Sequence, residues 1–172
     1  MSRIGVLGIG NVLMGDDAFG PYVVKLLEAR YELPGVELLE LGTPGADLPM
    51  HLEGFDTVLV VDTVKTRGEP GELRVFDKPQ LLAKKPILPS SPHEPGLREA
   101  LFTLQFSGAG PREVRLLGVI PAAVEMEVGL SPPVQASVPG AIEEVLRQLA
   151  ALGIAATPRA EPREPDLWWE RR

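Results

Sequence analysis

Two adjacent carboxylates, Asp16 and Asp17, follow a glycine-rich turn near the start of the chain. The apolar run Ile4 to Leu7 comes before that turn and predicts a buried strand. A third carboxylate, Asp62, ends the apolar run that begins at Thr57. Open α/β sheets build their sites at the edge formed by the carboxyl ends of their parallel strands. The two runs therefore predict acidic groups at one such edge.

An imidazole that could complete this site comes from His93. It lies in the loop sequence Ser-Pro-His-Glu-Pro-Gly rather than on an apolar helix face, and loops carry functional residues disproportionately. Two carboxylates and one imidazole suit a divalent metal with open positions, which could activate water or receive a ligand from a partner. Zinc, nickel, iron and manganese all accept such ligands. The other histidine, His51, falls in an expected surface helix and is interpreted as solvated.

Each acid also has a purely structural interpretation. Acids in the first turn of a helix offset the helix dipole, which would account for Asp16 or Asp17. Because adjacent helical residues face different directions, one acid can stabilise the helix while the other points into a site. Asp62 is costly at the end of an apolar strand unless it is paired, bound to a cation or exposed. The residues alone therefore leave open which member of the pair serves the site.

A nucleotide-binding loop is the main alternative for the glycine-rich turn. Gly8-Ile-Gly10 follows a strand, but Leu13 stands where the dinucleotide fingerprint needs its third glycine. Asp16 and Asp17 would also repel a pyrophosphate. The alternative of a nucleoside- or nucleotide-handling α/β enzyme is therefore disfavoured.

Periodicity along the rest of the chain predicts the scaffold for these residues. Strands are expected at Ile4–Leu7, Val36–Leu41, Thr57–Val61, Leu73–Phe76 and Glu113–Ile120, and helices at Asp17–Arg30, Ala46–Leu52, Leu97–Leu104 and from a cap at Ser137 to about Leu152. The run from Thr57 is apolar throughout, as expected of a central parallel strand covered on both faces. This alternation predicts a three-layer α/β fold with a largely parallel sheet.

Bulk composition excludes several classes of protein. The 172 residues carry a net charge of −7 without a basic block, so no nucleic-acid partner is expected. No cysteine is present, which excludes disulfides and a cysteine nucleophile. No apolar run could span a bilayer and no signal-peptide layout is visible, so we expect a cytoplasmic protein.

The chain is expected to form one domain over residues 1–154, followed by a tail over residues 155–172. Prolines and charges alternate in that tail, a composition that predicts mobility. The tail ends in the pair Trp168-Trp169, which could be a docking anchor or a packed end.

Taken together, these motifs resemble the hydrogenase maturation proteases, which trim the C-terminal extension of the nickel–iron hydrogenase large subunit. The matching stretches are Gly8–Asp17 with Gly20, Gly42–Gly45, Val61–Thr63, Ser91–Leu97, Gly118–Pro121, Gly129–Pro132 and Val138–Pro139. Their order and spacing agree with the family as far as about Leu152. The resemblance implies an α/β/α sandwich of the phosphorylase/hydrolase-like type, with a twisted sheet of about five strands.

The resemblance also implies a site and a reaction. Asp17, Asp62 and His93 align with the family's metal-binding and catalytic residues, whereas Ala18 departs from the glycine often found after the first acid. The implied reaction is a single endoproteolytic cut, of aspartyl or metal-dependent type, made after nickel has entered the large-subunit precursor. That nickel comes with the substrate and acts as the recognition signal, and zinc or cadmium could occupy the same ligands. The partner would be the precursor, and the enzyme is expected to be a monomer.

Two further hypotheses bear on this assignment. A non-catalytic, nickel-dependent checkpoint for hydrogenase assembly would keep the same ligands without cleaving. Because the three ligands are mixed and lie on loops, we also expect the free protein to hold no metal tightly. No G-x-S-x-G nucleophile elbow is present, which argues against acyl-enzyme hydrolysis.

Overall fold

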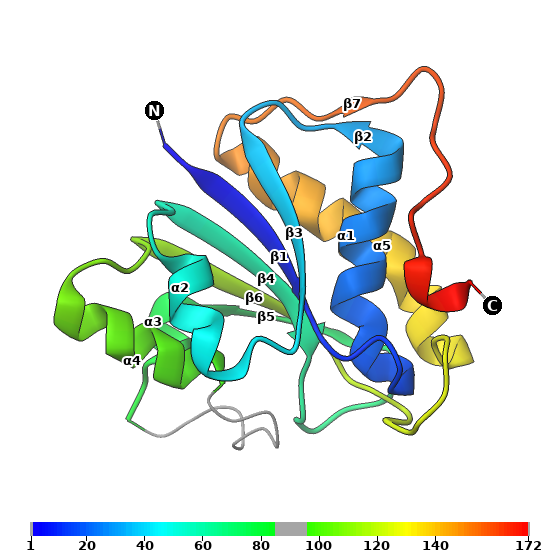
Figure 1. The fold of residues 1–172 in the computed structure, drawn as a ribbon, viewed down its shortest axis with the longest axis horizontal. Coiled ribbons are helices and arrows are strands. Elements are labelled where there is room, and N and C mark those ends of the chain that lie inside the picture. The colour runs from blue at the N-terminus through cyan, green and yellow to red at the C-terminus, as the bar shows by residue number, and fades with distance from the viewer. Residues whose placement is uncertain (1, 85–95, 172) are drawn as a thin grey trace.

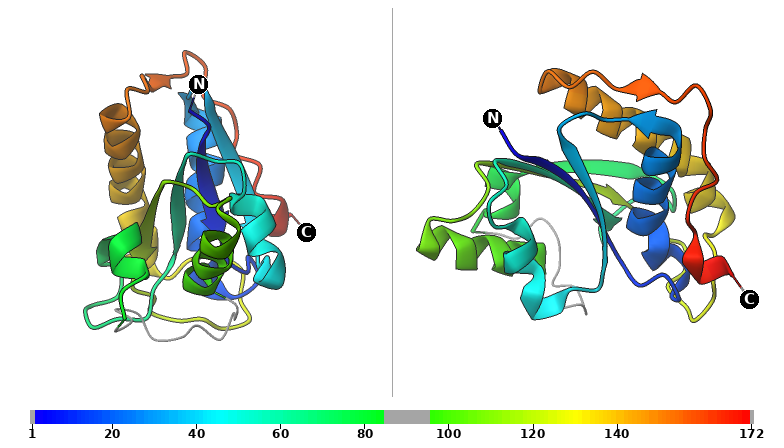
Figure 2. Two further views of the ribbon diagram at one scale, coloured as in Figure 1. Left: turned by 90° about the vertical axis from the view of Figure 1, so that its left-hand side faces the viewer. Right: turned by 45° about the horizontal axis from the view of Figure 1, so that its top comes forward.

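A five-stranded sheet lies between two layers of helices (Figures 1 and 2). The computed structural model describes residues 2–84 and 96–171. The strands are β1 (Ile4–Ile9), β3 (Val36–Gly42), β4 (Thr57–Thr63), β5 (Leu73–Asp77) and β6 (Glu113–Val119). Their order is β3-β1-β4-β6-β5; the first four run parallel, and β5 pairs antiparallel with β6 at the edge. The predicted fold class, with its mostly parallel sheet of five strands, is confirmed.

Helices of different length cover the two faces of the sheet. One layer holds α1 (Phe19–Arg30) and α5 (Pro132–Ala151), and the other holds α2 (Leu48–Leu52), α3 (Lys78–Leu81) and α4 (Leu97–Ser107) (Figure 1). The described residues also form short 3₁₀ turns, which are η1 (Gly15–Ala18), η2 (Gly45–Asp47) and η3 (Trp168–Glu170). A separate two-stranded ribbon pairs β2 (Tyr31–Glu32) with β7 (Thr157–Pro158).

The central position of strand β4 in the sheet explains why its residues 58–61 are all apolar. Leu59 and Val61 point into the core shared with α1 and α5, while Val58 and Val60 point into the core shared with α2 and α4. All four side chains are buried, and each contributes roughly 2 kcal/mol relative to an exposed position. The carboxyl ends of β1, β3, β4 and β6 consequently meet at one edge of the sheet.

The predicted start of the last helix is wrong. Helix α5 begins at Pro132, with Ser131 as its N-cap residue and prolines in its first turn, where a missing N–H does no harm. Ser137 lies inside the helix, and its hydroxyl donates to the carbonyl of Val134 at 2.7 Å. Pro139 is likewise an interior residue of α5.

Gly20 lies where the backbone of α1 packs closely against the sheet. A Cβ at this position would stand 2.1 Å from the carbonyl oxygen of Val61 and 2.7 Å from that of Ile9. We expect Gly20→Ala to lower the free energy of unfolding by about 3 kcal/mol, because backbone atoms must move apart to admit the methyl group. The measurement is the urea midpoint followed by circular dichroism.

A matched control is Gly140→Ala on α5. There the nearest atom to the added Cβ is Leu73 Cδ1 at 3.5 Å, an ordinary contact, and alanine is the better helix former. Its urea midpoint should equal or exceed that of the wild type. Equal midpoints for the two variants would refute close packing at Gly20.

Candidate active site

Asp17 bridges the ends of two neighbouring strands. It lies buried in η1, directly after the turn that follows β1. Its Oδ2 accepts the backbone N–H of Asn11 at 2.7 Å, and its Oδ1 accepts the hydroxyl of Thr63 at 3.3 Å. Because Thr63 is the last residue of β4, these contacts hold the carboxylate at the carboxyl edge of the sheet.

Asp62 stands beside Asp17 at that edge. Its Oδ1 accepts the backbone N–H of Thr63 at 2.7 Å. Burial raises the pKa of Asp62 well above its usual range, and the negative charge of Asp17 raises it further. The two carboxylates therefore repel one another through the protein, and a proton or a cation between them would relieve that repulsion.

The glycine-rich turn after β1 packs closely against the backbone of η1. Gly10 has φ +146°, and a Cβ there would lie 1.7 Å from the carbonyl oxygen of Asp17, so only glycine fits. The N–H of Gly10 donates to the carbonyl of Gly42 at 2.8 Å, which ties the turn to the end of β3. The turn is thus shaped around the backbone of η1.

Asp16 points away from Asp17 and holds a different loop. Its Oδ2 accepts the N–H groups of Ala122 and Ala123 at 2.8 and 3.0 Å, together with the hydroxyl of Ser131 at 2.8 Å. Its Oδ1 accepts the N–H of Ser131 at 2.7 Å. The carboxylate is fully buried and fastens both ends of the loop between β6 and α5. The structure therefore gives the two adjacent acids separate tasks, and Asp17 is the one at the site edge.

The remaining predicted ligand, His93, lies outside the described residues, so its place beside Asp17 and Asp62 stays a prediction. Within residues 2–84 and 96–171, no three histidine, aspartate or glutamate side chains are grouped as a metal site. His51 lies on α2 and is partly exposed. The described part of the site is thus the pair of carboxylates.

Two contributors to the site were missed by sequence reasoning. Thr63 donates to Asp17 through its hydroxyl and to Asp62 through its N–H, so it ties the two acids together. Asn11 orients the turn by accepting the N–H of Leu13 at 3.0 Å, and its own N–H binds Asp17. A hydroxyl residue next to a strand-end acid, and an asparagine within a glycine turn, were the available signals.

Known proteins are similar to this chain over most of its length. A family model described as hydrogenase maturation protease matches residues 21–148. The hydrogenase 2 maturation protease of Escherichia coli is 39% identical over 162 residues, covering 91% of this chain and 96% of the relative. The chain belongs to the hydrogenase maturation protease family. The predicted resemblance is confirmed, and the protein is a peptidase.

Other members extend the comparison to sequence and structure. The hydrogenase expression/formation protein HupM of Azotobacter chroococcum is 40% identical over 159 residues, covering 90% of this chain and 75% of HupM. The hydrogenase maturating endopeptidase HybD of E. coli superposes with a TM-score of 0.82 at 39% identity, over 92% of this protease and 98% of HybD. A hydrogenase 2 maturation peptidase from a Thaumarchaeota archaeon gives 0.67 at 34% identity, over 87% and 99%. Within the described parts of this maturation protease, no helix has the length and apolar content to cross a membrane.

Proposed function

We propose that this peptidase removes the C-terminal extension of a nickel–iron hydrogenase large-subunit precursor after nickel insertion. The observation that carries the proposal is the pair of carboxylates, Asp17 and Asp62, held side by side through Thr63. Their mutual repulsion favours a cation between them, and nickel bound in the precursor is such a cation. The names of the relatives, which describe hydrogenase maturation and endopeptidase activity, agree with this substrate.

In this proposal the metal belongs to the substrate. Asp17, Asp62 and His93 bind the nickel of the precursor and bring the bond to be cut to the carboxyl edge of the sheet. Zinc or cadmium would occupy the same oxygen and nitrogen ligands. The free enzyme would need no tightly held metal, because the precursor delivers it. An equimolar metal content that survives dialysis of the isolated protein would contradict this part of the proposal.

Exposed apolar side chains beside the site support a protein substrate. Leu13, Val124, Met126 and Val128 are all exposed, although each is a large hydrophobic residue. The segments that carry them are joined by the N–H of Gly15, which donates to the carbonyl of Glu127 at 2.7 Å. Exposed apolar groups collected in this way are typical of a surface that contacts a protein.

The test is cleavage of a co-expressed large-subunit precursor with and without nickel. Intact mass spectrometry should show the loss of a short C-terminal peptide only when nickel is present. His93→Ala should reduce the cleavage rate at least about 100-fold, as expected for loss of a group that acts at the reacting bond. His51→Ala, which removes the other histidine, should cleave like the wild type.

Each other outcome has a distinct meaning. Nickel-dependent binding of the precursor without any cut would replace the proposal with a binding checkpoint. Cleavage that is independent of nickel would overturn the role of the metal. Equal rates for His93→Ala and His51→Ala would remove His93 from the site.

A further inference from the structure

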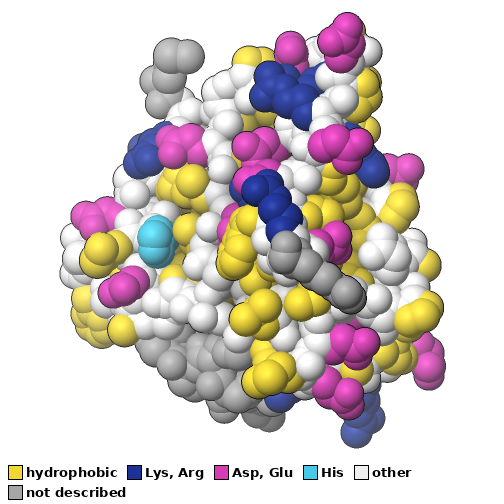
Figure 3. All heavy atoms as spheres, turned by 45° about the vertical axis from the view of Figure 1, so that its right-hand side comes forward, with side chains coloured by type: hydrophobic (Ala, Val, Ile, Leu, Met, Phe, Trp, Pro, Cys, Tyr) yellow, Lys and Arg dark blue, Asp and Glu magenta, His cyan; other side chains and the backbone are white. Residues whose placement is uncertain are grey.

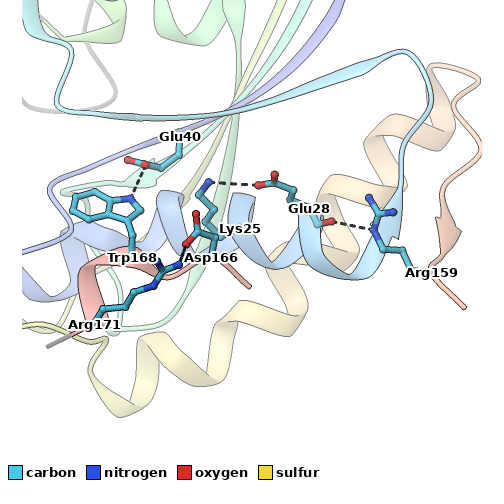
Figure 4. Close-up of polar contacts among 7 residues, drawn as sticks. All are labelled: Lys25, Glu28, Glu40, Arg159, Asp166, Trp168 and Arg171. Carbon is cyan, nitrogen blue, oxygen red and sulfur yellow. Dashed lines mark hydrogen bonds and ion pairs between the residues drawn. The ribbon is translucent and has the colours of Figure 1, made fainter. Parts of the chain in front are cut away.

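The C-terminal segment folds back along α1 and ends beside the start of that helix (Figure 1). We call residues 157–171 the C-terminal strap. Its backbone donates from Arg159 to the carbonyl of Arg30 at 2.8 Å and from Arg163 to that of Ala29 at 2.9 Å. The Arg159 side chain also donates to the carbonyl of Glu28 at 3.1 Å (Figure 4). The mobility expected from composition stays a prediction, but these contacts give the strap a defined course along the domain.

Trp169 anchors the end of the strap. It is 6% exposed and packs in a small apolar cluster with Val12, Ala18 and Tyr22. Its ring meets that of Tyr22 edge to face, with centroids 5.0 Å apart. The buried residues of this cluster belong to neither of the two main cores, and Leu130 packs against both this cluster and the core under α1 and α5. This face of the molecule mixes hydrophobic, acidic and basic side chains (Figure 3).

A hydrogen bond also joins α1 to Glu170, the residue that follows Trp169. The hydroxyl of Tyr22 donates to Oε1 of Glu170 at 2.5 Å. Burial raises the pKa of Tyr22 to about 12, and the bond to Glu170 contributes to the increase. The hydroxyl therefore stays protonated at neutral pH and remains a donor. Trp169 is thus held against α1 by a ring contact and by its neighbour's carboxylate.

The anchor touches both chain segments that set the position of Asp17. Val12 directly follows Asn11, whose N–H donates to the Asp17 carboxylate at 2.7 Å, and Ala18 directly follows Asp17 itself. Covering these two residues restricts the turn after β1 and the start of α1 together. Removal of the Trp169 side chain would therefore loosen the turn after β1 and the start of α1 while the main cores stay packed.

We propose that Trp169 is a positioning residue for Asp17, acting through Val12 and Ala18. The inference rests on the proposed function, in which Asp17 meets the substrate. Trp168 provides the contrast within the same strap. It is 48% exposed, and its indole N–H donates to Oε2 of Glu40 at 3.3 Å (Figure 4). Its ring meets that of Trp169 edge to face, with centroids 5.6 Å apart, but it is not part of the cluster with Val12, Ala18 and Tyr22.

The experiment compares Trp169→Ala with Trp168→Ala in the full chain by amide hydrogen exchange. Exchange at Asn11, whose amide donates to Asp17, should become about tenfold faster in Trp169→Ala because local opening becomes easier. Exchange at Val60 in the central strand should not change. In Trp168→Ala both amides should exchange as in the wild type, and Trp169→Phe should restore slow exchange at Asn11.

Cleavage of the nickel-loaded precursor provides the second readout. Trp169→Ala should lower kcat/KM roughly tenfold or more, since displacement of a site group costs that much. Trp168→Ala should stay within twofold of the wild type. If Trp169→Ala does not fold, Trp169→Leu takes its place in both measurements, because leucine fills part of the space but cannot make the ring contact with Tyr22.

The two readouts separate the possible failures. Unchanged exchange at Asn11, or equal acceleration in both tryptophan variants, overturns the role of Trp169. Faster exchange at Asn11 with unchanged cleavage overturns it as well. A wild type that cuts no precursor overturns the proposed function, while the exchange result still decides whether the strap fixes Asp17.

Discussion

Asp17→Asn should strongly slow cleavage of the precursor while leaving the fold in place. Asparagine has the same shape and keeps an oxygen for the N–H of Asn11, but it removes the negative charge that would face the metal. We expect kcat/KM to fall about 10³-fold, the scale on which preorganised electrostatic groups act. Urea denaturation followed by circular dichroism should show that the free energy of unfolding falls by only about 1 kcal/mol, since only the hydrogen bond with the Thr63 hydroxyl changes.

The matched control is Asp47→Asn. Asp47 lies in η2, after the neighbouring strand β3, and its side chain is exposed. The substitution Asp47→Asn removes one negative charge near the same edge of the sheet and leaves the contacts of Thr63 and Asp62 unchanged. The control should cleave at the wild-type rate. Retention of cleavage by Asp17→Asn within a few-fold would remove Asp17 from the chemistry.

The same substitution should also be visible at Asp62. The charge of Asp17 contributes to the raised pKa of Asp62, so its loss should move that pKa down toward the usual range. Burial would still hold the pKa of Asp62 above that of an exposed aspartate. Carboxyl carbon chemical shifts followed by NMR against pH would show the change, and an unmoved titration would mean that the two acids do not interact.

Asp16→Asn should have its main effect on stability. The carboxylate accepts three backbone N–H groups and one hydroxyl in a fully buried position. An amide in its place turns an NH₂ group toward donors, so at least one buried N–H loses its partner. Since hydrogen bonds to charged groups contribute about 1.5–3 kcal/mol each, we expect a loss of about 3 kcal/mol.

For a chain of this length that loss corresponds to a fall in Tm of roughly 10 °C. Thermal unfolding followed by circular dichroism measures it directly. Ser131→Ala is the graded comparison, because it removes the hydroxyl but leaves the N–H of residue 131 bound to Asp16. Its Tm should fall by about a third as much. A Tm for Asp16→Asn within 2 °C of the wild type would contradict the role of Asp16 as the fastener of the loop.

The contrast between Asp16 and Asp17 shows how far the sequence leads. Strand patterning placed Asp62 and the acid pair at one edge, because a run such as Thr57 to Val61 has one stable place in a parallel sheet. It could not decide between adjacent acids, because that choice depends on a loop that meets Asp16 from more than a hundred residues away.

Contacts between residues far apart in the sequence also explain why the start of α5 was predicted wrongly and why the packing of the strap was not predicted. Ser131 gives its hydroxyl to Asp16 instead of capping α5 with it, so its role was not visible in local sequence. Trp169 depends on Tyr22, and their contact joins opposite ends of the chain. Local propensity predicts elements well, whereas pairings across long sequence separations arise from tertiary packing.

These long separations have a consequence for synthesis of the enzyme. During translation Asp17 and Asp62 leave the ribosome before Ser131, and Trp169 follows later still. Contacts between distant parts of a chain cannot form until the later part exists. A nascent chain that stops before residue 131 therefore carries both carboxylates without the loop that Asp16 fastens. If Trp169 positions Asp17 as proposed, a chain that still lacks the strap would hold both acids without that support and would cut its substrate slowly.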